Sequence, residues 1–152
     1  MNLRILAIDY GTRAAGIAIT DELRLTARPL ATIRWSGKDR TFLFAEIQRY
    51  INTYEVSELV VGLPLSMDGT TGAAAKRVIN FVELLRRELG LPIHLIDERL
   101  TSKEADDRLR AEGASRTERR SRSDEYAALI ILEDFLDRNG MVFTTDHFSV
   151  TS

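Results

Sequence analysis

Residues 5–21 read ILAIDYGTRAAGIAITD, two apolar runs separated by a short polar turn. Within residues 3–9 the first run is apolar on both faces of an extended chain, which predicts a central strand. The second run, AGIAIT, predicts another strand directly after the turn that holds Gly11 and Arg13. The first strand ends in a carboxylate, Asp9. Such an acid either caps a turn or serves a site at the strand end, where open sheets bind ligands.

The composition is that of one ordinary globular domain. The chain has 152 residues, of which 44% are hydrophobic and 29% charged, and its net charge is −2. No overall basic field therefore indicates a nucleic-acid binder, although a local basic patch would suffice. The absence of cysteine excludes disulfides, thiolate zinc sites and cysteine nucleophiles. Without a signal-peptide pattern or a membrane-length apolar run, we expect a cytoplasmic protein.

The rest of the chain predicts an α/β order. LTARPLATI predicts a third strand, in which Pro29 indicates an edge position or a bulge. Helical spacing predicts helices over 41–55 and 72–89, with the strand ELVVGLP between them, and PIHLID predicts a fifth strand. A helix is expected directly after DER, and a last one from about 123 to 136. Three antiparallel strands followed by crossovers predict a mixed sheet covered by helices.

We expect residues 1–139 to form the domain. Residues 140–152 have no clear place in this pattern, and we expect either an added strand or a loose C-terminal tail.

Two further acidic positions lie near the ends of elements. Asp97 and Glu98 end the fifth strand, and because neighbouring strand residues point to opposite faces, only one is expected to face a given site. Asp124 shares a helix face with apolar residues, where an unpaired carboxylate is costly. Ordinary alternatives exist for each: a helix-dipole acid, a salt bridge with Arg99, or a first-turn acid with Ser121 at capping-box spacing.

Taken together, these acids form a candidate site for one or two Mg²⁺ or Mn²⁺ ions, hard cations that prefer oxygen ligands. Two such ions can hold an attacking water and stabilise a leaving oxygen in phosphodiester cleavage. A charge run is usually a solvated face, but here basic residues stand beside the acids and are candidates for phosphate contact. They are Arg13, Arg99, Arg116, Arg119, Arg120 and Arg122.

Four segments resemble the YqgF or RuvX family of ribonuclease H-like proteins in their order and spacing. They are DYGTRAAGIAITD, VVGLPLSMDGTTG, LIDERLTS and SDEYAALIILEDFL, and the resemblance covers about residues 3–138. Members are described as pre-16S ribosomal RNA nucleases or Holliday junction resolvases. The resemblance implies a ribonuclease H-like fold with a five-stranded mixed sheet. It also implies a divalent-metal nuclease that acts on structured nucleic acid.

The resemblance also implies roles for individual residues. The first-strand aspartate of the family falls on Asp9, its DER acid on Asp97 and Glu98, and its last-helix aspartate on Asp124. Glu98 is favoured over Asp97 as the metal ligand because of its longer reach, which makes the expected ligands Asp9, Glu98 and Asp124. The phosphate-side arginine of the first motif falls on Arg13. Before the last aspartate the family often carries lysines where this chain has arginines, which preserves charge but alters phosphate geometry.

Several functions stay open at this point. The first is 5′-end maturation of pre-16S ribosomal RNA, and the second is resolution of Holliday junctions in branched DNA. Symmetric cleavage of two strands needs a dimer, so the chain is expected to be a monomer or a homodimer. A non-catalytic nucleic-acid-binding factor for ribosome assembly or transcription would keep the same fold. An actin-like or sugar-kinase-like ATPase shares the DYGTRAAG turn, but it needs a second lobe for which 152 residues leave no room.

Overall fold

The computed structural model describes residues 4–98, 101–137 and 143–144. Its elements follow one another as β1 (Arg4–Tyr10), β2 (Ala14–Thr20), β3 (Ala27–Arg34), α1 (Arg40–Tyr54), β4 (Val56–Leu63), α2 (Ala73–Leu89), β5 (Ile93–Asp97), α3 (Thr101–Ala111), α4 (Arg116–Asp137) and β6 (Phe143–Thr144). None of the helices in this described part combines the length and apolar character needed to cross a membrane.

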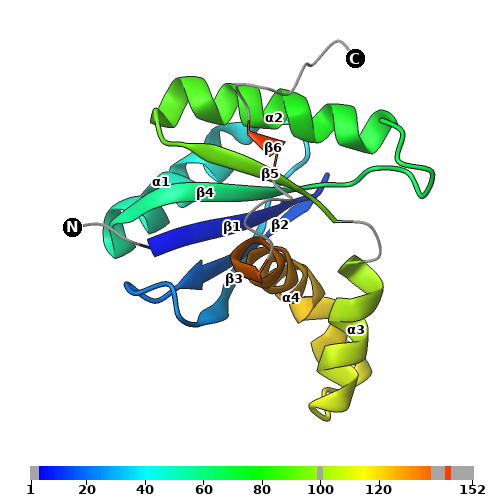
Figure 1. Cartoon of the computed structure of the whole chain (residues 1–152). Coiled ribbons are helices and arrows are strands. Elements are labelled where there is room, and N and C mark those ends of the chain that lie inside the picture. The colour runs from blue at the N-terminus through cyan, green and yellow to red at the C-terminus, as the bar shows by residue number, and fades with distance from the viewer. Residues whose placement is uncertain (1–3, 99–100, 138–142, 145–152) are drawn as a thin grey trace.

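The elements form one mixed sheet in the order β3-β2-β1-β4-β5-β6 (Figure 1). β1 pairs antiparallel with β2 and parallel with β4, and β4 pairs parallel with β5. The expected five-stranded mixed sheet is therefore confirmed, with β1 at its centre. Pro29 lies in the edge strand β3, at a register shift opposite Ile17 and Ala18 that leaves Leu30 unpaired. The two residues of β6 add a short antiparallel strand beside β5.

Helices cover both faces of this sheet (Figure 1). On one face, α1 and α2 pack over alternate residues of the central strands, such as Leu6 and Ile8 of β1. On the other face, α4 packs on Ile5, Ala7 and their neighbours in β2, β4 and β5. α3 packs against α4 rather than against the sheet. The alternation along β1 thus serves two separate cores, which explains why the strand is apolar on both faces.

The last helix begins earlier than the sequence pattern predicted. We expected a start near 123, with Ser121 as a candidate cap, but α4 begins at Arg116. Ser115 and Glu118 form the capping box: the Glu118 amide donates to Ser115 Oγ and the Ser115 amide donates to Glu118 Oε1, both at 3.1 Å. Nothing between this box and residue 123 breaks a helix, so the predicted start was wrong, and Asp124 lies beyond the second turn.

A glycine determines how closely α4 approaches the sheet. Gly16 of β2 pairs with Asp9 of β1. A Cβ atom added at Gly16 would lie 1.8 Å from the backbone oxygen of Asp124 and 2.1 Å from its carbonyl carbon. The helix backbone therefore rests directly on the sheet at this position. This contact places Asp124 beside the ladder pair that contains Asp9.

We expect Gly16→Ala to destabilise the protein by about 3 kcal/mol or more, because the new methyl would have to displace helix backbone. Thermal or urea unfolding measures the loss. Gly72→Ala is the matched control, since its Cβ would meet only Ser66 Oγ at 3.4 Å, and we expect a cost below about 1 kcal/mol. Equal losses in the two variants would contradict the role of this contact.

Candidate active site

Three carboxylates from distant parts of the chain line one open pocket. Asp9 comes from β1, Glu98 from the residue after β5, and Asp124 from α4. The pocket has a volume of about 440 Å³. Its other lining residues are Tyr10, Gly11, Pro64, Leu65, Met67, Ala74, Thr101 and Ser102. The loop after β4 contributes Pro64, Leu65 and Met67 to this lining.

Strand alternation directs Asp9 into the pocket. Ile5 and Ala7 pack with the core under α4, and Asp9 continues that face of β1. Tyr10 occupies the opposite face and stacks on Phe81 of α2 with ring centroids 3.9 Å apart. The Arg40 Nε–H donates to the Tyr10 hydroxyl at 3.1 Å. Asp9 is therefore mounted on a strand end that is held from the other side of the sheet.

A second glycine makes room for Glu98. A Cβ atom at Gly62 of β4 would lie 2.7 Å from the carboxyl carbon of Glu98 and 2.5 Å from Cδ1 of Ile131. The Glu98 side chain thus lies over the β4 backbone, beneath α4. The Glu98 amide donates to the Leu63 carbonyl at 3.1 Å, which ties the chain to β4 just after β5 ends.

Asp97, the residue before Glu98, lies on the opposite face of the sheet. Asp97 pairs with Leu63 in the β4–β5 ladder, and it does not line the carboxylate pocket. The two neighbouring acids therefore diverge, as strand geometry requires, and Glu98 is the one on the α4 side. The charge of Asp97 still contributes to raising the pKa of Glu98.

Burial and mutual repulsion make the pocket costly to ionise. Burial, together with the charge of Asp124, raises the pKa of Asp9 to about 6, although a hydrogen bond to Glu98 works in the opposite direction. Burial, the charge of Asp9 and that same hydrogen bond raise the pKa of Glu98 to about 9. Burial also raises the pKa of Asp124, against the charge of Arg34. The fold thus assembles negative charge where solvent stabilises it poorly.

The oxygen donors fit a hard divalent cation. The candidate ligands are carboxylates, the chemistry that Mg²⁺ and Mn²⁺ prefer. A bound positive charge would also relieve the repulsion that raises the pKa values of Asp9 and Glu98. In the described part of the chain, no three His, Asp or Glu side chains already stand together as a set that could hold a metal ion. The metal-ligand roles of Asp9, Glu98 and Asp124 stay a prediction.

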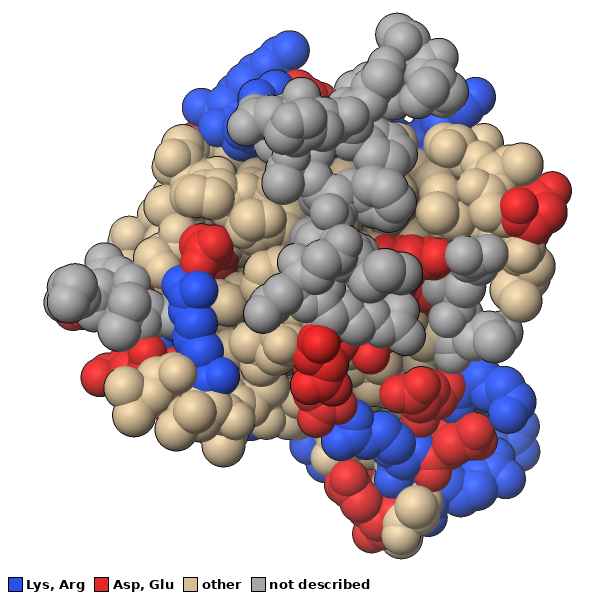
Figure 2. All heavy atoms as spheres, in the orientation of Figure 1, with Lys and Arg blue, Asp and Glu red and all other residues tan. Residues whose placement is uncertain are grey.

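The candidate arginines lie in different surroundings. Arg13 is exposed in the β1–β2 turn and does not line the carboxylate pocket, and Arg99 lies outside the described residues. Arg122 contacts Glu125 at 3.4 Å and lies over the Tyr126 ring, 5.0 Å from its centroid. The remaining three, Arg116, Arg119 and Arg120, line a second pocket between α3 and α4. Charged side chains of both signs gather over this part of the molecule (Figure 2).

One basic residue near the site was missed by the sequence analysis. Arg34, the last residue of β3, lies close enough to Asp124 for its charge to lower the pKa of that carboxyl. It pairs with Ala14 at the end of the β2–β3 ladder. Its position depends on strand pairing and on the packing of α4, so no local motif marks it.

Comparisons with known proteins agree on one family. The family model described as "RuvX: Holliday junction resolvase" matches residues 3–138. A protein of Anaeromyxobacter sp. (strain K), named "Putative pre-16S rRNA nuclease", is 44% identical over 138 residues, 90% of this chain and 98% of that protein. A protein of Lachnospira eligens with the same name is 40% identical over 136 residues, 89% of this chain and 97% of that protein.

Solved structures support the ribonuclease H-like fold. Thermus thermophilus RuvC, solved in complex with a Holliday junction substrate, matches with a TM-score of 0.57 at 15% identity, covering 94% of this chain and 99% of that one. The Fowlpox virus resolvase, solved with substrate Holliday junction DNA, matches with a TM-score of 0.55 at 10% identity, covering 90% and 99%. At such identities the likeness concerns the fold alone.

The raised pKa values predict that the cation-free protein loses stability as the pH rises. A carboxyl whose pKa is higher in the folded state contributes stability below its unfolded pKa, and that contribution is lost through about pH 6 for Asp9 and about pH 9 for Glu98. In EDTA we expect the free energy of unfolding to fall by at least about 1 kcal/mol between pH 5 and pH 9. Glu98→Gln should reduce this pH-dependent loss of unfolding free energy. The same dependence on pH in Glu98→Gln as in the wild type would contradict the electrostatic explanation.

Proposed function

The chain belongs to the RuvX family, and from this premise we propose that it is a divalent-metal-dependent nuclease that hydrolyses phosphodiester bonds in structured nucleic acid. The observation that carries the proposal is the convergence of Asp9, Glu98 and Asp124 on one open pocket. The family match and the names of the relatives point in the same direction. We propose 5′-end maturation of pre-16S ribosomal RNA as the reaction, because relatives of 40–44% identity are named pre-16S rRNA nucleases.

In this proposal the three carboxylates hold Mg²⁺ or Mn²⁺, which when bound supplies Lewis-acid stabilisation of phosphate charge and activation of water. Asp9 is the central ligand, because its strand is held on both faces. Glu98 and Asp124 approach from either side, one supported by Gly62 and the other by Gly16. Cation binding would release protons from Asp9 and Glu98, whose pKa values are raised, since ligating carboxyl groups must be ionised.

Branched DNA is the alternative substrate, favoured by the description of the matching family model as a Holliday junction resolvase. Among the described residues, the charged groups that line this pocket are all carboxylates, which would act on nucleic acid through a bound cation at a phosphate group, a feature that both polymers share. The choice therefore rests on the relatives' names, and the assays below include both substrates.

Asp9→Asn and Asp124→Asn should each fold and lose cleavage by at least about 100-fold, because each removes one anionic ligand from the cation. The assay uses a pre-16S 5′-leader RNA and a four-way DNA junction, with protein stripped by EDTA and titrated with Mn²⁺. Asp107→Asn is the matched control, since Asp107 is exposed on α3 and pairs with Lys103. Full cleavage by either site variant would contradict the assignment, and binding without product by the wild type would favour a non-catalytic factor.

Substituting Glu98 and Asp97 one at a time tests which acid of the DER segment is needed for cleavage. Glu98→Gln should lose cleavage to the same extent as Asp9→Asn, because Glu98 shares the pocket. Asp97→Asn should keep cleavage within about threefold, since its side chain lies on the other face of β5. Initial rates at saturating Mn²⁺ measure both. The reverse result, with Asp97 essential and Glu98 dispensable, would mean that the cation-loaded site uses the other acid.

A further inference from the structure

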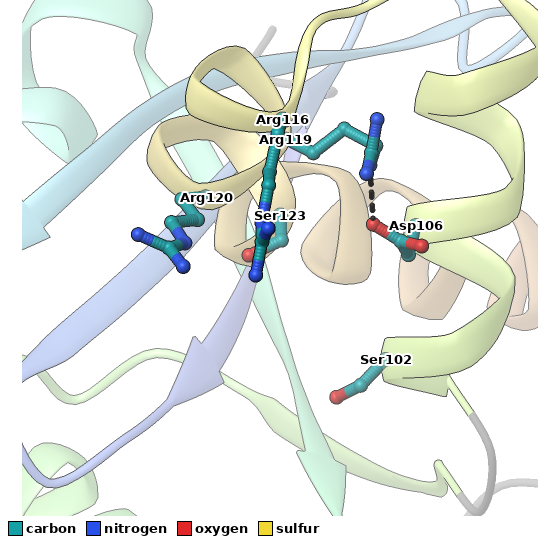
Figure 3. A pocket seen from close by; sticks show the side chains of 6 residues that line it. All are labelled: Ser102, Asp106, Arg116, Arg119, Arg120 and Ser123. Carbon is teal, nitrogen blue, oxygen red and sulfur yellow. Dashed lines mark hydrogen bonds and ion pairs between the residues drawn. The ribbon is translucent and has the colours of Figure 1, made fainter.

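A second pocket opens between α3 and α4 (Figure 3). It has a volume of about 340 Å³. Its lining residues are Ser102, Asp106, Arg116, Arg119, Arg120 and Ser123. The pocket adjoins the carboxylate site, since Ser102 lines both pockets and Ser123 directly precedes Asp124 in the chain.

Among the described residues that line this pocket, the one acid, Asp106, is already paired with arginines. Arg119 Nε lies 3.0 Å from Asp106 Oδ1, and Arg110 lies 3.2 Å from Asp106 Oδ2. Arg119 also donates to the Ala114 carbonyl at 3.2 Å. Arg119 is thus the least exposed of the three arginines here, and it joins α3 to the start of α4 (Figure 3). These contacts indicate that Arg119 has a structural role and does not bind a ligand.

The other two arginines are in a different position. Arg116 and Arg120 are exposed, stand one helical turn apart and extend away from the Arg119–Asp106 pair (Figure 3). Within the described residues neither guanidinium has a carboxylate partner. Because Ser115 and Glu118 already cap α4, any anion here is held by side chains. Guanidinium groups and serine hydroxyls are hydrogen-bond donors of the kind that phosphate oxygens accept from, and besides Arg119 this pocket presents two of each.

We propose that Arg116 and Arg120, with Ser102 and Ser123, form a subsite for a phosphodiester group of the nucleic-acid strand whose neighbouring phosphate lies at the carboxylates. The inference deepens the proposed nuclease function and rests on it. It divides the arginine run into two pairs. Arg116 and Arg120 bind the substrate backbone, whereas Arg119 and Arg122 are held by Asp106 and Glu125 and shape the α3–α4 layer.

The test is a salt titration of binding in EDTA, so that no cleavage occurs. The probes are a labelled pre-16S 5′-leader RNA and a labelled four-way DNA junction, each between about 50 and 200 mM salt. For Arg116→Gln/Arg120→Gln we expect about tenfold weaker binding near 0.1 M salt. The slope of log K against log salt should fall by about one, the value for one lost phosphate contact. Loss on one probe alone would assign the subsite to that polymer, and loss on both to their shared backbone.

Two control variants distinguish the loss of phosphate contacts at the subsite from a general effect of removing positive charge. Arg49→Gln/Arg87→Gln removes the same charge from exposed positions of α1 and α2, which cover the opposite face of the sheet. Arg122→Gln removes an arginine from the run itself, outside the pocket. Both should keep the wild-type slope, and circular dichroism checks the folding of each variant. An equal loss of slope in Arg122→Gln or in the α1–α2 double variant would overturn the proposal, as would wild-type binding by Arg116→Gln/Arg120→Gln.

Failure of the subsite and failure of the nuclease give different results. If Asp9→Asn abolishes cleavage while Arg116→Gln/Arg120→Gln binds with the same salt slope as Arg49→Gln/Arg87→Gln, the proposed nuclease function is supported and the proposed subsite is wrong. If the wild type cuts neither probe with Mn²⁺ but the double variant loses slope, the subsite stands and the protein binds nucleic acid without cutting it.

Discussion

The contact between the backbone of α4 and Gly16 is the constraint on which the rest of the structure depends. It brings a helix carbonyl to a distance from β2 that no side chain would permit. From this contact follow the depth of the apolar layer under α4, the position of α3 beyond it and the placement of Asp124 next to Asp9. One residue without a side chain therefore sets both the packing of a face and the geometry of the pocket.

The same packing creates an electrostatic conflict that the fold does not resolve by itself. Burial and the charges of neighbouring acids raise the pKa values of both Asp9 and Glu98, whose carboxyl groups are joined by a hydrogen bond. Buried apolar side chains from α4 and from β1, β2, β4 and β5 pack behind the acids, and their burial offsets this electrostatic cost. Such stored repulsion is typical of sites that bind a cation, where the ion replaces protons and turns an unfavourable cluster into a favourable one.

Local patterns in the sequence were sufficient for the strands and for the position of Asp9, because a central strand that ends in an acid is a short-range feature. Local patterns were insufficient where the role of a residue depends on contacts with distant parts of the chain. That Asp97 and Glu98 diverge follows from strand alternation, but the choice of Glu98 for the pocket follows from which face α4 covers. Within the arginine run, Arg119 differs from Arg120 only through Asp106 on another helix. The start of α4 was misplaced because two serine–acid pairs have the same spacing, and propensity alone does not rank them.

The edges of the sheet limit how two copies of the chain can associate. At one edge, Pro29 lacks an amide donor and the unpaired Leu30 interrupts the ladder of β3; at the other, the described part of β6 is two residues long. Within the described residues, neither edge presents a long, regular row of backbone donors and acceptors, which disfavours joining two sheets into one continuous sheet there. A symmetric pair suited to two strands of a junction would have to meet through helices or loops, and its two pockets would be oriented by those surfaces.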